Sequence, residues 1–161
     1  MNNNLQNWLL DRAYSILSDA QPVPFDCGRL CGAKCCAGGD GDGMLLLPGE
    51  ETRFENQEGF LVKDTEHGKV LVCEGQCDRS QRPLACRIFP CFPYVTENSG
   101  QYRISVLDDM RALGYCPLCG NDILPDFKRK VRMAARCLMR DDACLSFLLQ
   151  LSADLTDTGG L

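Results

Sequence analysis

The sequence predicts an α+β fold: a small single domain, 1–161, with an N-terminal helix, two short β-hairpins and C-terminal helices around a cysteine-rich metal centre. Apolar residues recur at helical spacing near both ends, paired apolar runs flank turn sequences in the middle, and 12 cysteines are grouped along the chain. A chain of 161 residues is long enough to bury one hydrophobic core. Within it we expect a metal-binding core at 25–120 and a C-terminal helical part at 121–155.

Two helices are expected in the N-terminal half. Residues 5–18 carry apolar side chains at intervals of three and four, with Asn4 available as N-cap, and Pro22 follows the segment. This pattern predicts an amphipathic helix that buries one face in the core. A second helix is expected to begin at residues 48–51, where a proline and two early carboxylates suit a helix start, and to reach about Gln57.

The C-terminal third is also predicted to be helical. Apolar residues from Phe127 to Leu138 share one helical face, and Asp141 and Asp142 can start another helix. The tail from Thr156 is expected to fray. The opposite face of the first helix carries six basic residues: Lys128, Arg129, Lys130, Arg132, Arg136 and Arg140. We interpret them as a solvated face rather than a nucleic-acid contact, because no aromatic or glycine-rich recognition pattern accompanies them.

Two β-hairpins are predicted between the helical segments. In the first, 61–62 and 70–72 flank a turn sequence, and the second strand leads into Cys73. In the second, 92–96 and 102–106 flank a turn, and the alternation of apolar and polar residues in the later strand indicates one buried face. The single histidine of the chain lies in the first turn, where we expect a solvated side chain rather than a metal ligand.

Charge and hydropathy narrow the classes of partner. The formal net charge is −5 and the pI about 4.9, so the chain has no general attraction to nucleic acid or anionic membranes. No positive region precedes the first apolar residues, and no stretch approaches the roughly 18 apolar residues of a membrane span. We expect a cytoplasmic protein with neither a membrane nor a nucleic-acid partner, and leave a protein partner open.

The cysteines are the chemically informative residues. They form five groups: Cys27, Cys31, Cys35 and Cys36; Cys73 and Cys77; Cys86 and Cys91; Cys116 and Cys119; Cys137 and Cys144. Such spacings in a cytoplasmic chain favour metal binding over disulfides, because that compartment keeps thiols reduced. Four thiolates complete either a tetrahedral zinc site or an iron–sulfur cluster such as [4Fe-4S], and the spacing leaves both open. The last group lies in a helical segment, where buried packing is the better interpretation.

Any such centre needs cations near it. Four thiolates around a zinc ion or a cluster core of charge two leave a net charge of about −2, which is costly to bury without donors and positive charges. Five basic residues are interspersed with the candidate ligands: Arg29, Lys34, Arg79, Arg82 and Arg87. We expect them to surround the centre and to stabilise its thiolates.

Two stretches together resemble the zinc- or iron-chelating domain family of bacterial and archaeal proteins. They are the first cysteine stretch and the segment from Arg82-Pro83 through Cys86-Arg87 to Pro90. That family carries a CxxCxxCC-type motif and an RPxxCRxxP-type motif, and each gap of the first motif is one residue longer here. The resemblance covers roughly 25–120 and implies eight metal ligands: Cys27, Cys31, Cys35, Cys36, Cys73, Cys77, Cys86 and Cys116. It implies a metal site without a reaction, and leaves Cys91 and Cys119 open as ligands.

Three functions remain open on these grounds. The first is a cytoplasmic metal-binding protein that holds an iron–sulfur cluster, zinc, or both through the clustered cysteines. The second is a redox or protein-modifying enzyme that uses the cluster as its active centre; no Ser-His-Asp set, phosphate loop or dinucleotide fingerprint indicates another chemistry. The third is a disulfide-rich interaction protein.

Overall fold

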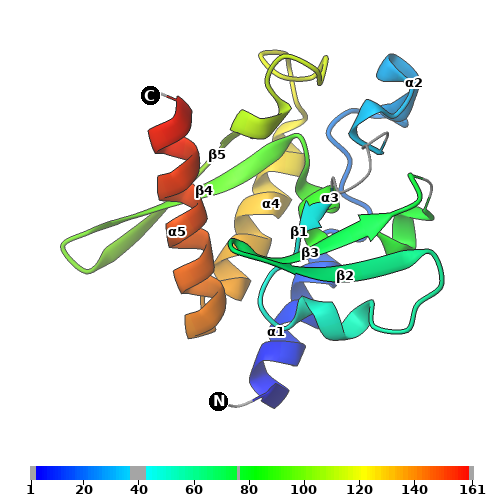
Figure 1. Ribbon diagram of the computed structural model, residues 1–161. Coiled ribbons are helices and arrows are strands. Elements are labelled where there is room, and N and C mark those ends of the chain that lie inside the picture. Colours follow the sequence, from blue (N-terminus) through cyan, green and yellow to red (C-terminus); the bar gives the residue numbers. More distant parts are fainter. Residues whose placement is uncertain (1–2, 37–42, 76, 160–161) are drawn as a thin grey trace.

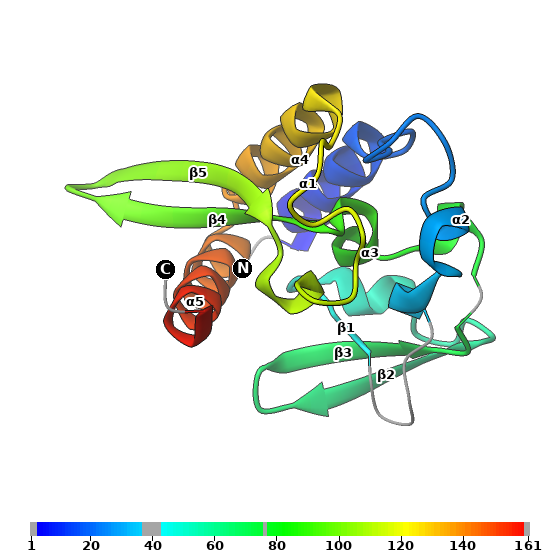
Figure 2. The same cartoon turned by 90° about the horizontal axis from the view of Figure 1, so that it is seen from above.

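The computed structural model describes residues 3–36, 43–75 and 77–159. Long helices frame one side of the molecule: α1 (Asn3–Ile16), α4 (Pro125–Leu138) and α5 (Asp142–Gly159). Helices α1 and α4 pack along each other, as Figures 1 and 2 show. Pro125 occupies the first turn of α4 and Asp126 complements the helix dipole there. The mixed fold of helices and two small antiparallel sheets confirms the predicted class.

Three expected helix ends are wrong. Helix α1 begins at Asn3, so Asn4 lies inside the helix and is not its N-cap, and the helix ends at Ile16 rather than at residue 18. Helix α5 continues to Gly159, whereas the tail was expected to fray from Thr156. The hydroxyls of Thr156 and Thr158 donate to carbonyls one turn earlier, at 2.7 and 2.9 Å, and so continue the hydrogen bonding of the last turn. The predicted start of α5 is confirmed, because the Asp141 carboxylate accepts from the Cys144 backbone N–H at 3.0 Å.

The first predicted hairpin is part of a three-stranded antiparallel sheet. Strands β2 (Phe60–Thr65) and β3 (Gly68–Cys73) form the hairpin, and β1 (Met44–Leu45) pairs with the other edge of β3, in the order β1-β3-β2. The expected helix at 50–57 is only a short 3₁₀ turn, η2 (Glu50–Arg53). Asn56, at φ 65°, adopts a left-handed conformation that an α-helix does not accommodate.

The second predicted hairpin consists of β4 (Cys91–Asn98) and β5 (Gln101–Asp108), both longer than expected. Ser99 and Gly100 form its two-residue turn and both have positive φ, at 53° and 78°, which matches the right-handed twist of the strands. The hairpin lies between α4 and α5 in Figure 2, and its tip projects away from the rest of the molecule.

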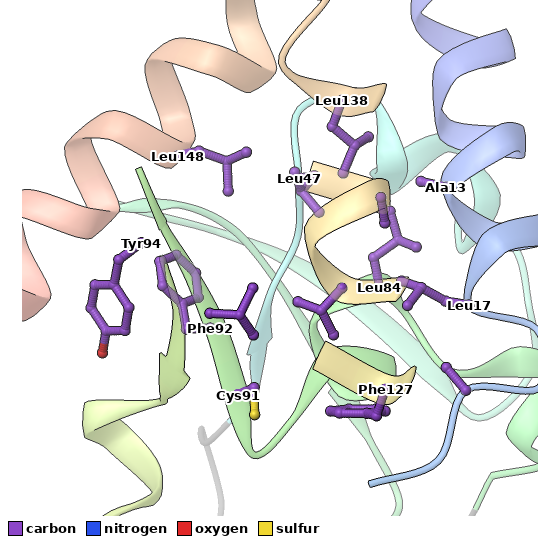
Figure 3. Close-up of a cluster of buried hydrophobic side chains, with 14 of the residues drawn as sticks. Ala13, Leu17, Leu47, Leu84, Cys91, Phe92, Tyr94, Phe127, Leu138 and Leu148 are labelled. Atoms are coloured by element: carbon purple, nitrogen blue, oxygen red, sulfur yellow. The ribbon is translucent and has the colours of Figure 1, made fainter. Parts of the chain in front are cut away.

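The main core lies where these elements meet. Figure 3 shows Ala13 of α1, Leu17 directly after α1, Leu84 of α3 (Leu84–Ile88), Phe127 of α4 and Leu148 of α5 converging on the β4–β5 hairpin. A second, small cluster of Leu46, Phe54 and Leu71 lies under the three-stranded sheet. Each fully buried leucine in such a core contributes about 2–5 kcal/mol against truncation to alanine.

The other short elements are α2 (Gly28–Cys31), η1 (Lys34–Cys36), η3 (Arg79–Gln81), α3 and η4 (Met110–Ala112). Among them, α2, η1 and α3 carry Cys31, Cys35, Cys36 and Cys86. In Figure 2, α2 lies at the end of the molecule opposite to the tip of the β4–β5 hairpin. Within the described ranges, no helix combines the length and the apolar character needed to cross a membrane.

Candidate metal centre

The first cysteine stretch folds into two short turns that reverse the chain. Helix α2 ends at Gly32, and both Gly32 and Ala33 adopt left-handed conformations, at φ 65° and 56°. The N–H of Ala33 closes the reversal by donating to the Gly28 carbonyl at 3.0 Å. Turn η1 then carries the last two cysteines of the stretch. Four sulfurs are thereby gathered on a short surface segment, because neither turn is long enough to separate them.

Two adjoining cavities lie beside this segment. The first cavity, of about 330 Å³, is enclosed by α2, η1, α3 and the segment 115–118. The second cavity, of about 550 Å³, is enclosed by η1, α3 and the end of β3. The two share a wall that includes Cys35, Cys36 and Cys86. The shared wall places segments that are far apart in sequence around one continuous space.

All eight cysteines implied as ligands line these cavities. Three line only the first cavity: Cys27, Cys31 and Cys116. Two line only the second: Cys73 and Cys77. The remaining three belong to the shared wall. All twelve cysteines of the chain are free thiols. Within the part of the chain that the structure describes, no three histidine, cysteine or acidic side chains are already arranged to hold an ion.

The other candidates lie outside the cavities. Cys91 is fully buried in the main core, where burial raises the pKa of its thiol to about 12. Cys119 lies beside Cys116 in a groove outside the first cavity, and burial, then the nearby Cys116, raise its pKa to about 11. Cys144 of α5 is buried in the main core, as expected for a packing residue, whereas Cys137 of α4 is only half-buried, with its sulfur 3.7 Å from the Leu9 carbonyl oxygen. The histidine, His67, lies exposed in the β2–β3 turn.

Thiols of the first cavity influence one another electrostatically. Burial raises the pKa of Cys27, and negative charge on Asp26, Cys116 and Cys31 raises it further. The pKa of Cys35 is raised by the hydrogen bond that its thiol donates to Cys36, then by burial and by the Cys36, Cys27 and Cys31 charges. These couplings show that the sulfurs of this cavity lie within electrostatic range of one another.

Thiols of the second cavity form a similar set. The hydrogen bond from Cys35 and the charge of Arg82 lower the pKa of Cys36 to about 6 against its burial, so this sulfur favours the thiolate form. Burial raises the pKa of Cys86 to about 12, and the charges of Cys36, Cys77 and Cys73 add to that increase. A cation placed among them would reverse these shifts, because it favours the thiolate that a metal ion requires.

The five basic residues expected around the centre all line the first cavity, but they act differently. Arg87 donates to the carbonyls of Arg82 and Ser80 at 2.8 and 2.7 Å, and Arg79 donates to the Ala20 carbonyl. Arg82 faces the sulfurs instead: it lowers the pKa of Cys36 and opposes the rise that burial causes in the pKa of Cys77. Among the described residues, its Nε is a buried nitrogen with no hydrogen-bond partner.

Two aromatic residues complete the shared wall and were missed from the sequence. The rings of Phe89 and Tyr115 stack with centroids 6.1 Å apart and an interplanar angle of 25°. Both line both cavities. Their positions in the sequence could have indicated them, because Phe89 follows Cys86 by three residues and Tyr115 directly precedes Cys116. They supply an apolar surface that limits solvent access beside the thiols.

Comparison of the chain with protein-family models, curated proteins and solved structures found no match in any of the three. The resemblance to the zinc- or iron-chelating domain family therefore depends on the motif residues between Cys27 and Pro90 and on Cys116.

Proposed function

We propose that this chain is a cytoplasmic metal-binding protein of the zinc- or iron-chelating domain type, and that its eight clustered cysteines hold zinc or an iron–sulfur cluster. One observation carries the proposal: eight cysteines from four separate parts of the chain line two adjoining cavities. Thiolate is the ligand form for both groups, and four thiolates complete either one.

Two features support the fit between these residues and a thiolate-bound metal. All eight cysteines are free thiols, so none of them is used in a disulfide. Arg82 brings a positive charge to the cysteines, and its buried Nε–H has no oxygen or nitrogen acceptor among the described residues. A metal-bound thiolate is an acceptor for such a donor, because it keeps negative charge on the sulfur. The metal would supply the cross-link that these short, irregular turns lack.

Metal analysis of protein purified without air tests the proposal. We expect stoichiometric zinc, or stoichiometric iron together with acid-labile sulfide and visible absorption. Replacing Cys86 by serine removes a ligand from the shared wall and is expected to lower the metal content. The control is Cys137→Ser, which changes a cysteine outside both cavities and should leave the metal content unchanged. A folded protein without stoichiometric metal would contradict the proposal.

A redox or protein-modifying enzyme is the second candidate, and the open space beside the cysteines favours it. The first cavity, about 330 Å³, lies within the size range of small-ligand sites and combines an aromatic wall with several basic side chains. A cluster there could react with a bound anionic or peptide substrate. Protein reconstituted with iron and sulfide should then cycle reversibly between two redox states in solution. A centre that is redox-silent and closed to small reductants would exclude the enzyme and leave metal binding as the proposed function.

A further inference from the structure

We propose that the eight cysteines form two separate metal sites of four sulfurs each, an inference that rests on the metal-binding function proposed above. The first site consists of Cys27, Cys31, Cys35 and Cys116. The second consists of Cys36, Cys73, Cys77 and Cys86. The two sites adjoin through the shared wall of the two cavities.

The cavity walls decide most of the assignment. Cys27, Cys31 and Cys116 line the first cavity and not the second, whereas Cys73 and Cys77 line the second and not the first. To complete four sulfurs, the first cavity therefore needs one cysteine from the shared wall, and the second cavity needs two. The wall offers three: Cys35, Cys36 and Cys86. The eight cysteines of the two cavities thus divide into two sets of four, while Cys119 lies in a neighbouring groove that Cys31 and Cys116 also line.

The segments that reach the shared wall assign its cysteines. The segment that follows Cys73 packs against Cys36, since a Cβ at Gly75 would lie 2.7 Å from the Cys36 carbonyl oxygen, so Cys36 belongs with the second set. We place Cys86 in the same set, because the second cavity needs two cysteines from the wall, and this leaves Cys35 for the first cavity.

The backbone explains how adjacent cysteines can serve different sites. Cys35 and Cys36 are consecutive residues of the 3₁₀ turn η1, where successive side chains leave the axis about 120° apart. Both residues line both cavities, so the peptide between them lies in the shared wall and each thiol is accessible from either side. The Gly75 backbone approaches the other side of this turn so closely that a Cβ at Gly75 would lie 2.7 Å from the Cys36 carbonyl oxygen. This close approach brings the segment after Cys73 against Cys36.

Titration of the metal-free full-length protein with Zn²⁺ alone tests the inference. Thiols that remain reactive are alkylated, and the modified cysteines are identified in each zinc-bound species by mass spectrometry. We expect binding to saturate at two ions per chain, one for each set of four thiolates. In the species that carries a single ion, the four protected cysteines should all belong to one set. This readout needs no substitution, so it does not depend on whether a variant folds.

Two substitutions separate the sites. Cys116→Ser should lose one ion and leave Cys36, Cys73, Cys77 and Cys86 protected from alkylation. Cys73→Ser should lose one ion and leave the other set protected. Cys119→Ser is the matched control, because Cys119 neighbours Cys116 but lies outside the first cavity, and it should keep both ions.

The outcomes distinguish this inference from the proposed function. Saturation at one ion, protected sets that mix the two groups, or loss of an ion in Cys119→Ser would overturn the two-site assignment while metal binding stands. A folded protein that binds no zinc, and that contains no metal when purified without air, would instead contradict the proposed function.

Discussion

Glu50 is a fully buried carboxylate with three hydrogen-bond partners. It accepts from the Tyr14 hydroxyl at 2.5 Å, from the Leu84 backbone N–H at 2.8 Å and from the Leu47 N–H at 3.0 Å. It thereby joins α1, the turn η2 and the first residue of α3. From the sequence, Glu50 was expected only as a carboxylate in the first turn of a helix. In the structure its side chain instead bonds the first residue of α3, the helix that carries Cys86.

Replacing Glu50 by glutamine should destabilise the protein by about 1–3 kcal/mol. Glutamine has the same size as glutamate, but one carboxylate oxygen is replaced by an amide N–H₂, which is a donor. In either orientation this amide faces a backbone N–H that now donates to the carboxylate, so that buried N–H loses its acceptor. Urea unfolding monitored by circular dichroism measures the change. The matched control is Glu58→Gln at an exposed position, where the change should be within about 0.5 kcal/mol.

The same residue should make stability depend on pH. Burial raises the pKa of Glu50 above its ordinary 4.5, although its hydrogen bonds oppose the shift. The folded state therefore binds this proton more tightly than the unfolded state. The resulting stabilisation is present below 4.5 and is lost as pH rises through the higher folded pKa. The difference in unfolding free energy between the unmodified protein and Glu50→Gln should shrink with rising pH; a difference that grows would contradict this.

At the scale of elements, the contact between α5 and β4 depends on one polar bond in an apolar interface. The Ser152 hydroxyl accepts from the Val95 N–H at 2.8 Å and donates to the Leu148 carbonyl at 2.6 Å. All three residues are buried. Because β5 pairs with the other side of β4, the Val95 N–H faces the helix, and the hydroxyl supplies its acceptor.

Ser152→Ala should cost about 1–3 kcal/mol, since it leaves the buried Val95 N–H without a partner. Ser146→Ala is the control: Ser146 lies exposed on the same helix, and the substitution should change stability by no more than about 0.5 kcal/mol. Chemical denaturation of both variants measures the difference, and hydrogen exchange at Val95 should rise only in Ser152→Ala. Equal stability of the two variants would show that the interface tolerates the loss.

At the scale of the whole molecule, the candidate metal centre lies at the margin of the hydrophobic core, against which Cys27 and Cys116 pack. The main core joins α1, α4, α5 and the β4–β5 hairpin, whereas the cysteine cavities lie beside α2, η1 and the end of β3. In α2 and η1 no residue is buried. Local stability should therefore be low in these turns unless a metal holds them.

Removing the metal with a chelator should consequently loosen one end of the molecule without unfolding the rest. Hydrogen exchange should increase several-fold in 27–36 and 77–88, while α1, α4 and α5 keep their protection and the helical circular dichroism signal persists. Exchange in the metal-loaded and chelated protein, measured by mass spectrometry, checks this. Unfolding of the whole chain on chelation would show that the core depends on the centre, and unchanged exchange would show that the turns are stable without metal.

Much of the fold could be predicted because its signals are local. Helical periodicity predicted α1, α4 and α5, and paired apolar runs predicted both hairpins. The errors concern one predicted helix and the ends of others. The segment after Pro48 forms a short turn rather than a helix, because Glu50 points inward to Leu84 and Asn56 takes a left-handed conformation. Helix α5 continues through Thr156 to Gly159, and the hydroxyls of Thr156 and Thr158 bond carbonyls of the preceding turn.

For the candidate site, the sequence by itself determined which residues have the chemistry: cysteines in short-spaced groups, with basic residues among them. Only the tertiary structure decided that Cys91 is buried in the core, that Cys119 lies outside the cavities and that Arg82, rather than Arg79 or Arg87, faces the sulfurs. It also decided how the cysteines divide between two cavities. The physical reason is that residue type and local periodicity depend on neighbours in the chain, whereas a cavity wall depends on contacts between segments far apart in sequence.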